Sequence, residues 1–119
     1  MKIHIILIAF GIFILSSCTK NSQVKVTYET TDAISTYSLN YLEKGGMMTT
    51  SVNPQSSQDK WTYSFTGDEG DIVYVSGKYS DPNSALKIII KVDGKMYKQA
   101  SNEGDTLKFL TVSGVVPYE

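Results

Sequence analysis

The chain of 119 residues contains no arginine, one histidine and one cysteine. The histidine, His4, and the cysteine, Cys18, both lie near the N-terminus, so the residues from 19 onward have no Ser-His-Asp or Cys-His catalysis and no zinc site built from these side chains. The glycine-rich phosphate loops GxxxxGKS/T and GxGxxG are also missing. A pair of carboxylates acting as in glycosidases is the remaining enzymatic alternative. We expect a protein that is not an enzyme and that holds no cofactor or metal.

Positive charge is scarce as well. The 11 basic residues are all lysines, and they face 12 acidic residues, for a formal net charge of −1. Nucleic-acid binding domains are usually basic and read phosphates and bases with arginine. The sequence therefore predicts no nucleic-acid partner.

A long apolar run of the kind that spans a bilayer is not found, because a spanning helix needs about 20 such residues. The apolar run at residues 5–15 (IILIAFGIFIL) has 11, follows the single positive charge of Lys2, and ends at two serines. A positive residue, a short apolar run and small residues are typical of a signal peptide.

Cys18 follows this run directly. It has no second cysteine for an intramolecular disulfide, and the only histidine that could activate it as a nucleophile lies within the segment expected to be removed. Residues 15–18 (LSSC) resemble the bacterial lipobox. This resemblance implies diacylglyceryl transfer to the sulfur of Cys18 and cleavage before it. Two or three acyl chains hold a protein stably on a membrane, so we expect a lipid-anchored protein.

The rest of the chain is rich in apolar residues that alternate with polar ones, which is the pattern of half-buried strands. Turn residues separate these runs, and Asp93-Gly94 predicts a two-residue hairpin. The carboxylates at residues 67–71 (GDEGD) are interpreted as a turn rather than a calcium site, since their spacing does not match an EF-hand loop. The pattern predicts seven or eight strands, at about residues 23–30, 33–41, 47–52, 60–66, 71–78, 85–92, 95–100 and 106–113.

These strands predict an all-β fold, an antiparallel β-sandwich. We expect residues 1–17 to be a cleaved lipoprotein signal peptide, residues 18–23 the lipidated N-terminus and a short tether, and residues 24–119 one sandwich domain. The expected core residues are Val26, Leu39, Trp61, Phe65, Val73, Val75, Ile88, Ile90, Val92, Leu107 and Phe109.

Several segments match a known pattern together: residues 26–29 (VTYE), 34–37 (ISTY), Trp61, residues 72–77 (IVYVSG) and residues 88–95 (IIIKVDGK), followed by Ser101 and Gly104. This pattern resembles the extracytoplasmic domain of MmpS-like small membrane proteins and of similar small Bacteroidetes lipoproteins. The resemblance covers most of residues 24–114 and implies an immunoglobulin-like sandwich. It also implies a role as an accessory subunit of a large lipid transporter, and it brings no catalytic residues.

Two classes of function follow as hypotheses. The first is a non-enzymatic envelope lipoprotein whose sandwich presents an edge strand or loops to a protein partner, such as a transport complex. The alternative is a module that binds a glycan or a peptide, and a third interpretation is a hydrolase inhibitor acting through the loop at residues 51–59. The candidate contact residues for a ligand or partner are Trp61, Tyr63, Tyr74 and Tyr79, and for Trp61 a place in the core is the favoured expectation.

The predicted location is the bacterial cell envelope. Thr19, and not aspartate, follows the lipidated cysteine, and no acidic run follows it. We therefore expect an outer-membrane lipoprotein that faces the periplasm, attached to the membrane through Cys18.

Overall fold

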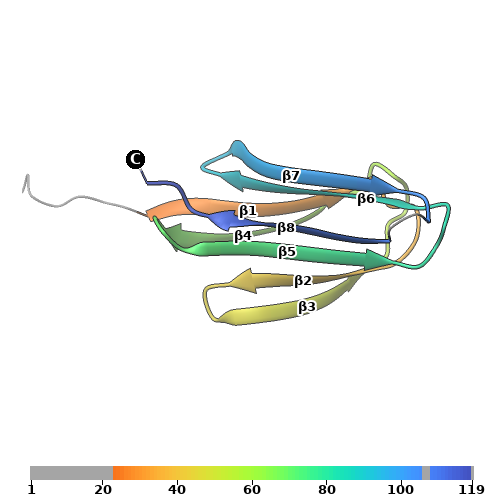
Figure 1. Ribbon diagram of the computed structural model, residues 1–119, viewed down its shortest axis with the longest axis horizontal. Coiled ribbons are helices and arrows are strands. Elements are labelled where there is room, and N and C mark those ends of the chain that lie inside the picture. Colours follow the sequence, from red (N-terminus) through yellow and green to blue (C-terminus); the bar gives the residue numbers. More distant parts are fainter. Residues whose placement is uncertain (1–22, 106–107, 119) are drawn as a thin grey trace, which may run out of the picture.

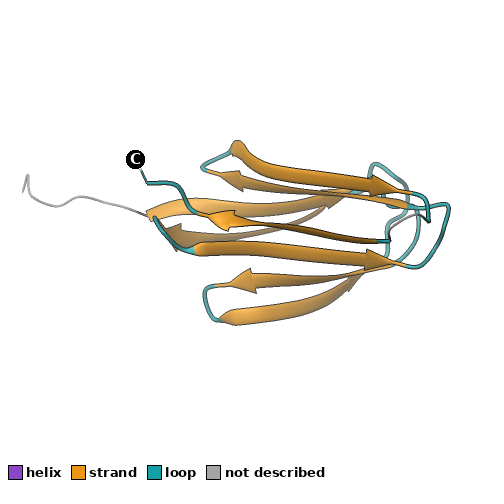
Figure 2. Ribbon diagram, in the orientation of Figure 1, coloured by secondary structure: helices purple, strands orange, loops and turns teal. Residues whose placement is uncertain are grey.

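The computed structural model describes residues 23–105 and 108–118, and within them eight strands form two antiparallel sheets of four strands each. One sheet has the order β4-β1-β6-β7 and the other the order β3-β2-β5-β8, and the two pack face to face (Figure 1). The all-β antiparallel sandwich predicted from the sequence is confirmed, and the described connections between the strands are loops (Figure 2). The strands are β1 (Gln23–Thr31), β2 (Tyr37–Glu43), β3 (Gly46–Val52), β4 (Trp61–Asp68), β5 (Ile72–Tyr79), β6 (Ala85–Val92), β7 (Lys95–Glu103) and β8 (Phe109–Val115).

The first strand lies inside its sheet, between β4 and β6. In antibody constant domains the first strand of the ABED sheet lies at an edge. The two folds thus share the architecture of two packed sheets and differ in the position of the first strand.

The alternation in the sequence is what forms the core. In β1 and β6 the inward-facing side chains are buried except that of Val92, which is half-buried. The intervening ones are exposed or half-buried except Glu29, which is buried and forms an ion pair with Lys91. The turn between β6 and β7 has positive φ at both central residues, 51° at Asp93 and 81° at Gly94, which confirms the predicted primed hairpin. The buried apolar side chains are Val24, Val26, Tyr28, Ala33, Tyr37, Leu39, Tyr41, Val73, Val75, Tyr79, Leu86, Ile88, Ile90, Val112 and Val116.

One core residue shapes the end of the sandwich at which β1 begins. Tyr28 is fully buried, and its hydroxyl donates a hydrogen bond to the carbonyl of Leu42 (2.6 Å) and accepts one from the amide of Tyr74 (3.3 Å). The paired register of β2 and β5 stops at Tyr41 and Val75, one position earlier. The hydroxyl from the other sheet therefore satisfies backbone groups of β2 and β5 where these two strands cease to pair.

Some expected strand boundaries and core positions are wrong. The strand expected at residues 33–41 begins only at Tyr37, because Asp32 has a positive φ of 77° and its amide bonds to the carbonyl of Ser57 in another loop. Phe109 is 47% exposed, since its pairing with Lys78 places it on the outer face of its sheet.

Trp61, Phe65 and Val92 pack against the core and are only partly buried. Trp61 and Phe65 belong to β4, which lies at the edge of its sheet, and Val92 precedes the exposed turn at residues 93–94. The expected core residue Leu107 lies outside the described residues, as do the predicted signal peptide and Cys18. Among the residues that are described, no helix has the length and apolar character needed to cross a membrane.

Candidate functional site

The two long flanks of the sandwich differ in how their edge strands are protected. On one flank β7 and β8 lie at the edges, and the hydroxyl of Tyr97 donates to the carbonyl of Val115 (2.6 Å) and accepts from its amide (3.3 Å). The ring of Tyr97 lies so close to Gly114 that a Cβ there would be 3.0 Å from it. A side chain of one sheet thus occupies backbone groups at the edge of the other.

β7 has further protection of its own. A register shift interrupts its pairing with β6 at residues 90–91, and lysines stand at positions 95 and 98. Bulges and lysines are common means by which edge strands avoid pairing with other chains.

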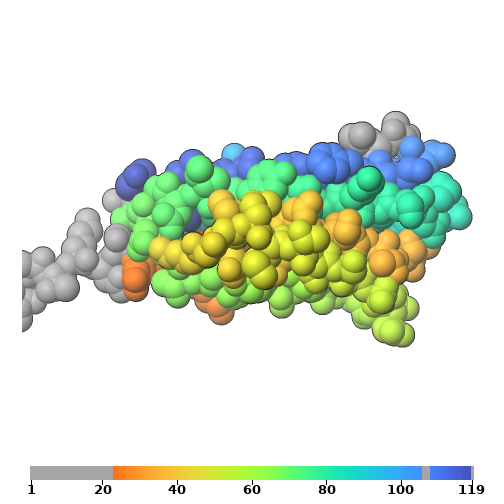
Figure 3. Space-filling view, turned by 90° about the horizontal axis from the view of Figure 1, so that it is seen from below, coloured from red at the N-terminus to blue at the C-terminus, as the bar shows by residue number. Residues whose placement is uncertain are grey.

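The opposite flank, with β3 and β4 at its edges, lacks these features. β3 (GMMTTSV) has no charged residue and no proline, and its seven residues pair with β2 without a register shift. Within the described part of the chain β3 is hydrogen-bonded to β2 alone. Figure 3 looks onto this flank, where β3, drawn in yellow, runs along the surface. An uncharged edge strand with free backbone groups is a template for pairing with another strand.

Aromatic rings from β4 lie beside this edge. Trp61, Tyr63 and Phe65 are spaced by two residues and pair with Thr30, Tyr28 and Val26 of β1, so all three rings point to the inside of the sandwich. Because β4 is the last strand of its sheet, these rings are only partly buried.

Tyr41 of β2 connects these rings to the other sheet. Its ring centroid lies 5.1 Å from that of Trp61 and 4.9 Å from that of Tyr63, and the rings of Trp61 and Tyr63 are nearly parallel at 6.4 Å. Such tilted and offset pairs are favourable arrangements of aromatic rings. We refer to β3 together with Trp61, Tyr63 and Phe65 as the open flank.

Met48 shows that the open flank is incompletely covered. It pairs with the buried Tyr41, so it lies on the inward side of β3, and yet it is 43% exposed. An inward-facing apolar side chain with this exposure indicates that sheet β4-β1-β6-β7 does not extend over β3.

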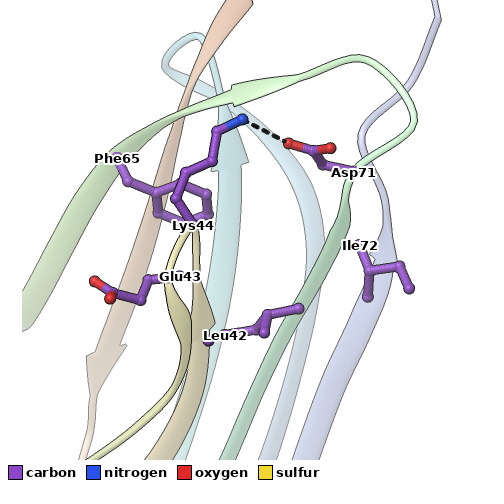
Figure 4. A pocket seen from close by; sticks show the side chains of 8 residues that line it. Leu42, Glu43, Lys44, Phe65, Asp71 and Ile72 are labelled. Carbon is purple, nitrogen blue, oxygen red and sulfur yellow. Dashed lines mark ion pairs between the residues drawn. The ribbon is translucent and has the colours of Figure 1, made fainter.

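A pocket of about 470 Å³ lies at the end of the open flank, where β2 and β5 cease to pair. Its lining combines apolar side chains with one cluster of charges (Figure 4). The lining residues are Leu42, Glu43, Lys44, Gly45, Gly46, Phe65, Asp71 and Ile72.

Lys44 of this pocket is paired with two carboxylates. The Nζ atom of Lys44 lies 2.7 Å from Oδ2 of Asp68 and 3.5 Å from Oδ2 of Asp71. The amide of Asp68 donates to Asp71, which lowers the pKa of that carboxyl, and the hydrogen bond to Asp68 raises the pKa of Lys44. Asp68 and Asp71, two of the three carboxylates at residues 67–71, thus both pair with Lys44, and no group of three or more metal-binding side chains occurs in the described ranges.

Tyr63 links the aromatic rings to this pocket. Its hydroxyl donates to Oε2 of Glu43 at 2.5 Å, and this hydrogen bond to a carboxylate raises the pKa of Tyr63. The polar end of the ring is therefore held by a residue of the other sheet.

The structure places the four candidate contact residues in different environments. Trp61 and Tyr63 lie together on the open flank. Tyr74 is partly buried on β5, and Tyr79 is buried with its hydroxyl bonded to the carbonyl of Gly104 (2.8 Å). Tyr79 therefore presents no ring at the surface, and Cys18 lies outside the described residues.

Met48 and Tyr41 were missed as members of the site. Tyr41 belongs to an alternating run that predicted a strand, but the alternation does not show that its ring packs against residues of β4.

The chain matches no protein-family model and no curated protein.

Proposed function

We propose that the protein is a lipid-anchored, non-enzymatic protein of the bacterial cell envelope, and that its sandwich binds an extended segment of a protein partner along β3. The observation that carries the proposal is the unprotected edge of β3, an uncharged and regularly paired strand on a flank without the closure seen at Tyr97. The immunoglobulin-like transport subunits that the sequence resembles suggest a transport complex as the partner.

The mode of binding follows from the geometry of an edge strand. A partner segment that extends the sheet forms backbone hydrogen bonds with β3, and pockets for alternate side chains supply selectivity. On this flank the apolar side chain of Met48 and the partly buried ring of Trp61 are available to such side chains. Backbone pairing and apolar contact would thus act together.

A glycan-binding role receives less support from the same residues. Stacking of a sugar requires a free aromatic face, whereas Trp61 packs against Tyr41 and lies nearly parallel to Tyr63. The faces of these rings are used in packing β4 of one sheet against β2 of the other.

The lipid anchor is tested separately from binding. Cys18→Ala removes the sulfur that would carry the lipid, and the apolar run at residues 5–15 is too short to span. We expect palmitate labelling and membrane association of the wild type to be lost in this variant. Retention of the label in Cys18→Ala would contradict the lipoprotein assignment.

Binding is tested by photo-crosslinking in the native membrane with the full chain. A photoreactive residue at Thr49 on β3 should give a defined crosslinked protein, whereas the same residue at Gln99 on β7 should not. Met48→Lys places a charge on the inward side of the edge and should abolish the crosslink, while Phe109→Lys, at an exposed apolar residue of the protected edge strand β8, should leave it unchanged. Equal crosslinking from both strands, or no effect of Met48→Lys, would refute the role of β3.

A further inference from the structure

The exposed apolar side chains are gathered at one end of the sandwich. Eight large apolar side chains among the described residues are exposed, and two of them, Ile34 (51%) and Phe109 (47%), lie at the end away from the start of β1. The other six lie toward the end at which β1 begins, and they are Met47, Met48, Ile72, Met96, Val115 and Tyr118.

This end also contains the two termini of the described chain. Gln23 pairs with Asp68 just before the β4–β5 turn, and Val115 pairs with Ile72 just after it. Figure 1 shows the start of β1 and the C-terminal segment on the same side. We call this the anchor end. It comprises the turns at residues 44–45, 69–71 and 93–94, residues 116–118, and the strand residues next to them, which include the six exposed apolar side chains.

Two pockets open near the anchor end. Besides the pocket of about 470 Å³, a second one of about 270 Å³ is lined by Val92, Met96, Tyr97 and Pro117 together with Asp93 and Lys95. Tyr118, the most exposed of the large apolar residues at 77%, lies next to Gly70. Apolar surface is thus spread across the end and not confined to one strand.

The length of the tether limits where this end can be. Five residue steps separate Cys18 from Gln23, and an extended chain spans at most about 3.6 Å per residue, so the lipidated cysteine lies within about 18 Å of the start of β1. Strands of seven to nine residues rise about 3.3 Å per residue, so the opposite end is roughly 25 Å farther along the sandwich. The anchor end is the part of the domain that the tether holds next to the bilayer.

We propose that the anchor end is a membrane-contact surface that lies against the bilayer carrying the lipid of Cys18, an inference that rests on the lipid anchor proposed above. Its charges identify the type of contact. Acidic residues at positions 43, 68, 69, 71 and 93 outnumber the lysines at positions 25, 44 and 95, so attraction to anionic lipid does not drive it. Apolar and aromatic side chains such as Ile72 and Tyr118 suit the interface between headgroups and acyl chains.

The orientation would leave the open flank accessible. β3 runs from the anchor end toward the opposite end, so a partner segment along it would stand away from the bilayer surface. Membrane contact at one end and strand pairing along one flank would therefore operate on the same molecule at the same time.

The test uses the full lipidated protein reconstituted in zwitterionic phosphatidylcholine vesicles, with a fluorescent probe on a single introduced cysteine. Ile72→Cys and Met96→Cys report on the anchor end, and Ile34→Cys and Phe109→Cys are matched controls of comparable exposure at the other end. Lipids spin-labelled near the headgroup quench probes at the depth that interfacial side chains reach, about 5–10 Å. We expect several-fold stronger quenching at residues 72 and 96 than at residues 34 and 109.

The outcomes separate this proposal from the proposed function. Equal quenching at all four positions, in protein that floats with the vesicles, overturns the membrane-contact surface and leaves the lipid anchor standing. Protein that does not float with the vesicles overturns both.

Discussion

Removal of the Trp61 ring should weaken the sandwich without unfolding it. Replacement of a fully buried tryptophan or phenylalanine by alanine costs roughly 3–5 kcal/mol. The ring of Trp61 is only partly buried, and its centroid lies 5.1 Å from that of Tyr41 and 6.4 Å from that of Tyr63. We therefore expect Trp61→Ala to lower the free energy of unfolding by about 2 kcal/mol. For a domain of this size 1 kcal/mol corresponds to roughly 4–8 °C, which gives a fall in Tm of roughly 8–16 °C.

Urea denaturation followed by circular dichroism measures this loss, and Trp61→Phe serves as the control that keeps an aromatic ring. Ile34→Ala, at an exposed loop position, should change the free energy of unfolding by less than about 0.5 kcal/mol. Trp61 is the only tryptophan of the chain, so its emission in the wild type should be partly blue-shifted and partly accessible to quenchers. A decrease in the free energy of unfolding above about 4 kcal/mol would mean that the ring is packed as a core residue. A decrease as small as that of Ile34→Ala would mean that the ring does not stabilise the packing of the two sheets.

Two further substitutions test the packing of the core. Gly77→Ala places a Cβ 2.4 Å from Cδ2 of Leu86 and should cost roughly 1–3 kcal/mol in urea denaturation, whereas Gly45→Ala in an exposed turn should cost much less; similar values for both would contradict the close packing. Tyr28→Phe leaves the carbonyl of Leu42 without its hydrogen bond and should lose about 1–3 kcal/mol at neutral pH. Burial raises the pKa of Tyr28 to about 12 from its ordinary value of 10.0. The difference in the free energy of unfolding between the wild type and Tyr28→Phe should therefore be constant below pH 10 and fall as the pH rises through 12. A constant difference up to pH 12 would show that the hydroxyl is not desolvated.

The strands and their inward faces could be predicted from the sequence because they depend on local alternation. A period of two assigns side chains to opposite faces wherever the chain is extended, and eight such runs appear with turn residues between them. The common face of Trp61, Tyr63 and Phe65 followed from this rule, and the hairpin at Asp93-Gly94 followed from the turn preference of the Asp-Gly pair. The rule failed where the backbone left the strand, as at Asp32, and where a residue was assigned to the wrong face of its strand, as at Phe109.

The tertiary structure decided which of these strands are edges. Period-two alternation is the same in a central strand and in an edge strand, because it reports the two faces of a sheet and not the neighbours on either side. The exposure of β3, the partial burial of Trp61 and the burial of Tyr79 all depend on pairings between residues far apart in the chain. The hydroxyl of Tyr97 hydrogen-bonds to the backbone of Val115 on the flank of β7 and β8, and no such contact protects β3 within the described residues. This difference between the two flanks depends on residues far apart in the chain, and it is the reason β3 is the proposed site of binding.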